Sequence, residues 1–497
     1  MKKRQQKKTT VQKAGNKKIA LNAALIMLAW LILIGIYHTH KPLPEGVAVE
    51  GKIYGLPESD IVFLSDITSL SPEGERISDQ QIFDAIFAAI DDAHEFIILD
   101  MFLFNEFQGD IKAYHRNLSS ELTTAVLEKK RDYPDISILF ITDPVNTAYG
   151  AGATPRLEAL RKEGVQVIVT DLKNLRDSNP AYSALWRAFL QWFGTKGIGT
   201  VPHPFDAGSP KVPLRSYYAL LNFKANHRKV LVADDGAGGY TSIISSANPN
   251  DASSAHTNVA LRIKGSIAEN IIPSELAIAS FSGGKAHGVM PKGMQQQQGT
   301  LSVQFITERA IKDSLLGAFR SSGKGDHIEV VMFYLSDRDV TEELLRASAR
   351  GAEISLTLDP NKDAFGRRKN GIPNRQVAYE LVSKSKGRIS IRWYETHGEQ
   401  NHAKMVLIKK ADGTAILILG SANLTKRNLD NLNLEANVRV EASADAPVMQ
   451  DAQEFITLIK ENTDGNLYTV PYDRYKDDSF FKYWLYRFQE WSGMGTF

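Results

Sequence analysis

The sequence predicts an α/β protein with two similar α/β sandwich halves, preceded by an N-terminal transmembrane helix. Three observations predict this fold. Helix and strand patterns alternate in the same order twice, a polar motif recurs near the end of each pattern, and an apolar stretch lies close to the N-terminus. With 497 residues the chain can form two cores, because single cores rarely grow beyond about 250 to 300 residues. An internal duplication explains the repeated order better than chance.

The N-terminal segment has the features of a membrane anchor. Residues 1–18 contain eight basic and no acidic side chains. Residues 19–37 are almost entirely apolar, and roughly 20 such residues cross a bilayer as a helix. An uncleaved anchor fits better than a cleaved signal peptide, because the apolar run is long and no small-residue cleavage site follows it. The positive-inside rule then predicts a cytoplasmic tail at 1–18 and an extracytoplasmic body.

A proline-containing segment, residues 38–60, is expected to be a tether to the first domain. Beyond it, each half repeats three units of an amphipathic helix followed by an apolar strand, which indicates sheets covered by helices. The predicted helices are 82–90, 122–130, 156–162, 311–319, 342–349 and 375–382, and the predicted strands are 96–102, 136–144, 165–169, 328–334, 352–360 and 389–393. We place the first half at 61–290, a linker at 291–300 and the second half at 301–497.

Composition limits the classes of function. The chain has no cysteine, which excludes disulfides, thiolate metal sites and cysteine nucleophiles. Outside the basic tail, acidic side chains outnumber basic ones by six. A nucleic-acid enzyme usually carries a basic face that collects phosphates, so this balance makes nucleic acid an improbable partner.

The repeated motif is a His-x-Lys pair followed by a Ser-x-Asn pair. Its members are His227, Lys229, Ser246 and Asn248 in the first half, and His402, Lys404, Ser421 and Asn423 in the second. The serine follows the histidine by 19 positions in both copies, and each His-x-Lys opens a strand pattern. Because side chains two apart on a strand share a face, each half presents one imidazole and one ammonium together.

Two such half-sites, brought together, suit a phosphodiester. The lysines and the Ser/Asn pairs can hold the nonbridging oxygens and stabilise charge in the transition state. One imidazole can attack phosphorus to form a phosphohistidine, while the other protonates the leaving alkoxide. Water or an alcohol then accepts the phosphoryl-bearing group. The lysines supply the positive charge, so the chemistry requires neither a metal nor a cofactor.

In these motifs the chain resembles the phospholipase D superfamily, whose signature is His-x-Lys-x4-Asp with a downstream Ser-x-Asn in each of two α/β halves. The first copy matches through Asp234, whereas the second has Lys409 at that position. The resemblance implies a mainly structural role for this acid. It also implies that Glu435 orients a catalytic histidine, and it favours His227 as nucleophile and His402 as acid. Spacing alone does not decide between the histidines.

Membrane anchoring favours a phospholipid substrate and predicts a single-pass membrane enzyme of phospholipase D type. The alternatives are a cardiolipin synthase-type transferase, a nuclease-type phosphodiesterase and an inactive lipid-binding module. Two aromatic-rich stretches, 182–205 and 480–491, either rest on the bilayer or pack as ordinary helices. The lipid head group, the choice between hydrolysis and transfer, and the oligomeric state stay open.

Overall fold

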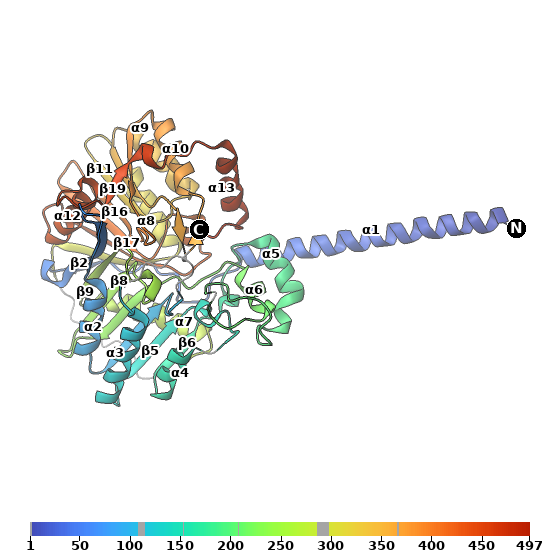
Figure 1. Cartoon of the computed structure of the whole chain (residues 1–497), viewed down its shortest axis with the longest axis horizontal. Helices are drawn as coiled ribbons and strands as arrows, with labels where there is room; N and C mark the ends of the chain where they lie inside the picture. Colours follow the sequence, from blue (N-terminus) through green and yellow to red (C-terminus); the bar gives the residue numbers. More distant parts are fainter. Residues whose placement is uncertain (1, 108–114, 153, 207, 286–297, 365–366) are drawn as a thin grey trace.

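A computed structural model describes residues 2–107, 115–152, 154–206, 208–285, 298–364 and 367–497. Two large β-sheets pack against each other through a shared core, and helices cover the outer face of each sheet (Figure 1). Most of the expected linker at 291–300 lies outside the described residues.

The first sheet has eight strands in the order β3-β2-β9-β8-β7-β4-β5-β6. Their bounds are β2 Ile61–Leu70, β3 Arg76–Gln80, β4 Phe96–Met101, β5 Ser137–Thr142, β6 Gln166–Val169, β7 Lys229–Asp234, β8 Tyr240–Ser245 and β9 Asn258–Lys264. Strands β4, β5 and β6 are parallel, and the pairs from β4 through β7, β8 and β9 to β2 are antiparallel.

The second sheet has nine strands in the order β1-β10-β18-β17-β16-β11-β12-β15-β19. Their bounds are β1 Tyr54–Leu56, β10 Leu301–Thr307, β11 His327–Met332, β12 Glu353–Leu358, β15 Ile389–Tyr394, β16 Lys404–Lys409, β17 Thr414–Gly420, β18 Ala436–Ser443 and β19 Thr469–Pro471. A small ribbon is formed by β13 (Asp363–Ala364) and β14 (Arg367–Arg368).

Seven strands of one sheet match seven of the other in order and direction. β2-β9-β8-β7-β4-β5-β6 corresponds to β10-β18-β17-β16-β11-β12-β15, with the parallel pairs at the same places. The two-half α/β fold predicted from the repeated pattern is confirmed.

The helices bury their apolar stripes on the sheets. α2 (Ile82–Asp92), α3 (Leu118–Asp132) and α4 (Pro155–Lys162) cover the outer face of the first sheet. α8 (Arg309–Arg320), α9 (Arg338–Ala349) and α10 (Asn374–Ser385) cover the second. α7 (Ala268–Phe281) and α12 (Pro447–Glu461) contribute to the core that the two sheets share.

Residues 38–60, the expected tether, pack against the body. Its strand β1 pairs with β10 at the edge of the second sheet. Val47 is fully buried, and its carbonyl accepts a hydrogen bond of 2.9 Å from Arg228 of the first half. The segment therefore touches both halves.

Helix α1 (Lys2–His40) projects from the body (Figure 1). It is longer than the apolar run from which it was predicted. Its portion Asn16–His40 has a mean hydropathy of 2.5 and is almost unburied, so among the described residues it is the one helix long and apolar enough to cross a membrane.

Candidate active site

A cavity of about 360 Å³ lies where the two halves meet. Its lining includes both motif histidines, His227 and His402, and both motif asparagines, Asn248 and Asn423. Residues of both copies of the motif therefore lie at one cavity.

Each histidine is held by the backbone of the other half. Strand β7 begins two residues after His227, whose N–H donates to the Leu434 carbonyl at 2.9 Å. Strand β16 begins two residues after His402, whose N–H donates to the Thr257 carbonyl at 2.8 Å. Separating the halves would release both imidazoles, so the site exists only in the assembled pair.

The imidazoles are oriented by different partners. His227 Nδ1 lies 2.9 Å from the Glu435 carboxylate, and His402 Nδ1 lies 3.1 Å from the side-chain oxygen of Asn258. Both partners are hydrogen-bond acceptors, so Nδ1 carries the proton in each ring and Nε2 is the nitrogen left for a substrate.

The residues behind the histidines also correspond. Val259 N–H donates to Ser246 Oγ, and Ala436 N–H donates to Ser421 Oγ, both at 3.0 Å. The serine hydroxyls in turn donate to Asn258 and Glu435, respectively. Asn258 is therefore the structural counterpart of Glu435.

The serine hydroxyls, which the sequence suggested as phosphate ligands, are fully buried and already engaged. They position Asn258 and Glu435 instead of reaching a substrate. Asn248 and Asn423 do line the cavity, and the Asn423 side-chain oxygen is buried without a partner. Of the predicted phosphate-binding groups, the structure thus brings the two asparagines to the cavity.

The lysines lie beside aromatic rings that line the cavity. Lys229 Nζ is 4.8 Å from the ring centre of Phe102, and Lys404 Nζ is 5.3 Å from that of Phe333. Each ammonium also donates to the carbonyl of its own motif histidine at 2.6 Å. Burial lowers the pKa of Lys229 to about 7, and burial with repulsion from Lys229 lowers the pKa of Lys404 well below its ordinary value.

Electrostatics favour an anionic ligand. Burial lowers the pKa of His227 to about 4, although the Glu435 carboxylate opposes this. Burial and the nearby Lys404 lower the pKa of His402 well below its ordinary value. Burial alone would raise the pKa of Glu435, yet His227 and Lys229 hold it below its usual range. A phosphate in the cavity would favour the protonated forms of the lysines and of one imidazole.

Asp234, one of the candidate catalytic residues, is not among the residues that line the cavity. It ends β7, the strand that Lys229 begins. Its carboxylate accepts backbone N–H bonds from four residues, which are His94, Glu95, Phe96 and Gly236. Asp234 therefore clamps the start of β4 to the end of β7, which agrees with the mainly structural role that the resemblance implied.

The second half replaces this clamp from the opposite strand. Lys409 occupies the position of Asp234, but Asp326, just before β11, accepts the Ala411 N–H at 2.9 Å and lies 3.2 Å from the Lys410 ammonium. The departure at Lys409 is thus compensated locally, far from the histidines.

The Asp-Pro pairs that end two predicted strands also have a role. Asp143 accepts the backbone N–H of Asn226 at 2.8 Å, and Asp359 accepts that of Asn401 at 2.9 Å. Each asparagine precedes a motif histidine. Burial raises the pKa of both carboxyl groups to about 7. The repeated Asp-Pro therefore marks a second fixed point beside each histidine.

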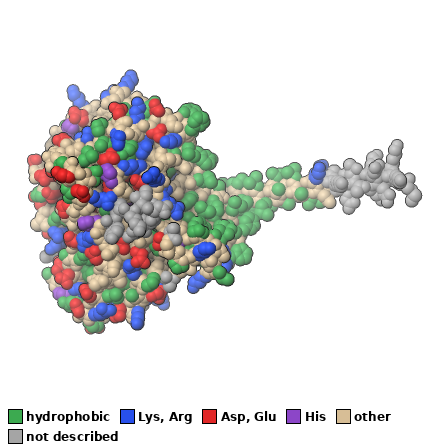
Figure 2. All heavy atoms as spheres, in the orientation of Figure 1, with side chains coloured by type: hydrophobic (Ala, Val, Ile, Leu, Met, Phe, Trp, Pro, Cys, Tyr) green, Lys and Arg blue, Asp and Glu red, His purple; other side chains and the backbone are tan. Residues whose placement is uncertain are grey.

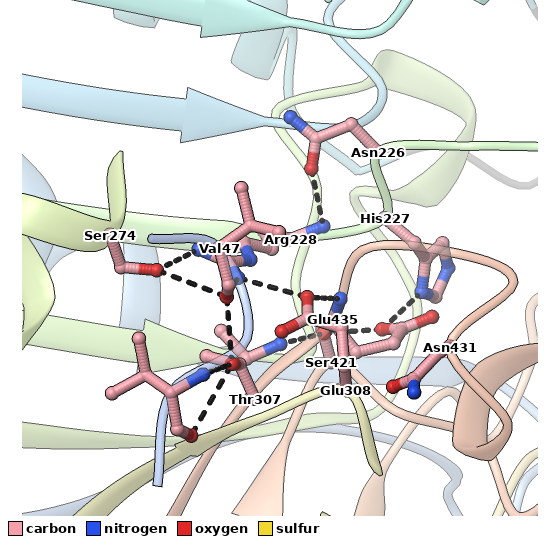
Figure 3. A network of polar contacts seen from close by, with 12 residues as sticks. Val47, Asn226, His227, Arg228, Ser274, Thr307, Glu308, Ser421, Asn431 and Glu435 are labelled. Carbon is pink, nitrogen blue, oxygen red and sulfur yellow. Dashed lines mark hydrogen bonds and ion pairs between the residues drawn. The ribbon is translucent and has the colours of Figure 1, made fainter. Parts of the chain in front are cut away.

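A buried ion network connects His227 to the interface between the halves (Figure 3). Arg228 is fully buried and pairs with Glu275 at 3.0 Å and with Glu308 at 2.9 Å. Glu308 also accepts the Glu435 N–H at 3.1 Å. In Figure 3, His227 and Arg228 point to opposite sides of their backbone, and Glu435 lies on the His227 side.

Sequence reasoning missed several residues. Asn258 could have been found by aligning the two halves, because it stands where the second half has Glu435. Arg427 lines the cavity, and its guanidinium donates to the carbonyls of Gly493, Gly495 and Phe497. Burial lowers its pKa to about 10. No sequence signal marks Arg427, because its place depends on the C-terminal turn.

Comparison with known proteins bears on this geometry. Residues 316–459 match the family model described as cardiolipin synthase, PLD-like domain. The resemblance to the phospholipase D superfamily is confirmed. The match lies in the second half, and the first half has the same strand order. The second half is thus similar to a domain of the phospholipase D type. A search of curated proteins found no match.

A solved phosphatidylserine synthase resembles this chain in fold. Phosphatidylserine synthase of Haemophilus influenzae Rd KW20 has a TM-score of 0.55 and 11% identity, over 93% of this chain and 97% of that one. At this identity the similarity shows the fold alone. Nuc of Salmonella typhimurium, a phospholipase D family member, is 18% identical over 34% of this chain and 97% of its own, with a TM-score of 0.26.

Proposed function

We propose that the protein is a membrane-anchored phosphodiesterase or phosphatidyltransferase of phospholipase D type, which acts on phospholipid through a phosphohistidine. The observation that carries this proposal is the pair His227 and His402, which line one cavity while an acceptor fixes Nδ1 of each. The halves at 61–290 and 301–497 act as one unit, because each holds the histidine of the other.

In the first step His227 Nε2 attacks phosphorus and a P–N bond forms. The P–O bond to the leaving group breaks, and His402 in its imidazolium form gives its proton to the departing alkoxide. Lys229 and Lys404 offset the charge on the nonbridging oxygens. In the second step His402, now neutral, takes a proton from water or an alcohol, whose oxygen attacks phosphorus. The P–N bond then breaks and His227 is restored.

The partner of each imidazole supports this assignment. A ring phosphorylated at Nε2 and protonated at Nδ1 is cationic, and the Glu435 carboxylate 2.9 Å from His227 Nδ1 stabilises that charge. His402 has the neutral Asn258 at the same place. A proton on His402 is therefore held less tightly and is given up more easily, as an acid requires.

A phospholipid is the substrate that the surroundings favour. The cavity wall contains aromatic side chains, among them Phe102, Phe205, Phe223 and Phe333. Helix α1 has the length and hydropathy of a membrane span. With the basic tail in the cytoplasm, the body stands on the other side of the membrane, beside the lipids of the outer leaflet.

The test is incubation of the full chain with labelled phosphatidylglycerol, phosphatidylcholine or single-stranded DNA, with and without added alcohol. Phosphatidic acid would demonstrate hydrolysis, and cardiolipin or a phosphatidylalcohol would demonstrate transfer. His227→Ala and His402→Ala should each abolish product. His327→Ala is the matched control, since His327 is half-exposed at the start of β11. Loss of DNA alone, or lipid binding without product, would contradict the proposal.

A further inference from the structure

Exposed large apolar side chains gather beside the membrane helix. On α13 (Phe480–Ser492) they recur on one face, while Tyr486 and Glu490 on the other face are buried. A second group lies on residues 180–198, here called the α5 segment, which comprises α5 (Pro180–Leu185), the short helices Trp186–Leu190 and Gln191–Phe193, and the loop after them. The most exposed members are Trp192, Phe193, Ile198, Phe480, Phe481 and Trp491. Figure 2 shows this hydrophobic surface around the base of α1.

Outside these segments and α1, such side chains are fewer among the described residues, namely Ile53, Ile77, Tyr133, Leu214, Leu221, Leu467 and Met494. The patch is thus concentrated on the side from which α1 leaves the body. Cations lie within it, since α13 carries Lys482 and Arg487. Aromatic side chains mixed with Lys and Arg are typical of surfaces that rest at the membrane interface.

The α5 segment packs directly on the membrane span. A Cβ added at Gly35 would lie 3.4 Å from the Pro180 carbonyl oxygen and 3.8 Å from the Ala184 Cβ. Further along α1, the rings of Trp30 and Phe189 pack edge to face with centres 5.9 Å apart. Trp30 lies ten residues before the end of α1 at His40, which corresponds to about 15 Å of helix. If α1 crosses a bilayer, Phe189 therefore lies below the level of the headgroups.

The two apolar segments meet next to the catalytic cavity. Gly493, at the end of α13, packs so closely on Ser178 that a Cβ there would overlap the Ser178 carbonyl. The following residues Thr496 and Phe497 line the cavity. Tyr217 and Leu220 of α6 (Leu214–Leu220) also line the cavity. The Tyr182 hydroxyl donates a hydrogen bond to the Tyr218 carbonyl, which joins α6 to the α5 segment. The cavity wall thus includes residues next to both segments.

We propose that α13 and the α5 segment dock onto the bilayer that α1 crosses, and that a phospholipid enters the cavity from that leaflet between them. The bilayer is the occupant because the patch is continuous with α1 through Gly35 and Phe189. The substrate in this inference rests on the proposed function, whereas the docking does not. Lipid would then reach the histidines without leaving the membrane.

The absence of cysteine permits a direct test. Single cysteines are introduced as Trp192→Cys and Phe481→Cys, with Ile77→Cys on β3 as the matched exposed control. Each is labelled with an environment-sensitive fluorophore in the full chain, reconstituted in phosphatidylglycerol and phosphatidylcholine vesicles. Lipid-borne quenchers should reach labels at 192 and 481, and aqueous iodide should reach the label at 77. Equal iodide quenching at all three positions would overturn docking. Docking would also be overturned if protection of the labels at 192 and 481 from iodide depended on protein concentration, because that would indicate coverage by a second copy of the chain.

Turnover tests entry from the leaflet separately. Trp192→Glu and Phe481→Glu should slow turnover of vesicle phospholipid by about tenfold, because a charge opposes insertion of the patch. With a soluble short-chain phospholipid the same variants should stay within about twofold of the parent protein, because the cavity is untouched. Equal loss on both substrates would overturn entry between the two segments. Absence of turnover in the parent protein would contradict the proposed function, while the quenching result would still decide docking.

Discussion

The two half-sites share one framework and differ in the group behind each histidine. Nδ1 of His227 contacts the Glu435 carboxylate, and Nδ1 of His402 contacts the Asn258 amide oxygen. The serines behind these groups and the cross-half backbone bonds are the same in both. A carboxylate stabilises positive charge on its ring far better than an amide does. One position therefore makes a duplicated scaffold chemically asymmetric.

The remaining differences lie further from the cavity. Arg228, between His227 and Lys229, pairs with two buried carboxylates, whereas the second half has Ala403 there. The carboxylate that accepts backbone N–H bonds at the far end of the strands is Asp234 in the first half and Asp326 in the second. These stabilising contacts thus differ between the halves, while the hydrogen bonds around each histidine correspond.

Substitution of either motif histidine should lower kcat the most. A substrate with an activated leaving group should distinguish the nucleophile from the acid. On phospholipid, His227→Ala and His402→Ala should each lower kcat by about 10⁴-fold or more. On phosphatidyl-p-nitrophenol, the leaving group needs no proton. His402→Ala should then release one burst of p-nitrophenol and stall as a phosphohistidine.

Stopped-flow absorbance would follow that burst, and His227→Ala should give none. A burst in His227→Ala and its absence in His402→Ala would reverse the assignment. Absence of a burst in both variants, with residual steady turnover, would contradict the covalent intermediate.

Substitutions of Glu435 and Asn258, which contact Nδ1 of the two motif imidazoles, should have the next largest effects on activity. Glu435→Gln should lower kcat by about 10²-fold to 10³-fold, because the phosphorylated ring loses its counter-charge. Asn258→Asp should raise the pKa of His402, since an added carboxylate favours the imidazolium. A group that must be protonated then works to higher pH, so the alkaline limb of the kcat profile should move upward. An unchanged limb in Asn258→Asp would argue against His402 as the acid.

The repeated pattern was sufficient to predict the two-half fold, because alternation of helix and strand and the fixed spacing from His to Ser are local features. It also predicted a shared site for His227 and His402, both of which line the cavity. It could not place Ser246 and Ser421, since whether a hydroxyl faces the cavity or the residue behind the histidine depends on the turn after the strand. Arg427 was missed because distant backbone carbonyls hold it. The contacts of residues 38–60 with both halves are non-local, so the sequence does not reveal them.

Arg228 should matter chiefly for stability. Arg228→Met leaves Glu275 and Glu308 buried without their cation, which should cost about 3–5 kcal/mol. Melting of the purified chain would measure this loss. Adding Glu275→Gln and Glu308→Gln to Arg228→Met should recover much of the loss, because the unpaired charges are removed. If Arg228→Met melts like the parent protein, the network does not hold the halves together.

The clamp at the far end of the strands should have the smallest effect. Asp234→Asn weakens acceptance of four backbone N–H bonds and should cost about 1–3 kcal/mol, with kcat within about twofold. Lys409→Asp in the second half should change stability by less than about 0.5 kcal/mol, because Asp326 already serves there.

Although burial opposes it, the backbone N–H groups lower the pKa of Asp234. The ionised Asp234 carboxylate therefore stabilises the fold above its unfolded-state pKa, and this stabilisation is lost as pH falls through its folded-state pKa. The difference in melting temperature between Asp234→Asn and the parent protein should consequently shrink in acid. A large loss of kcat without loss of stability would instead return Asp234 to the catalytic machinery.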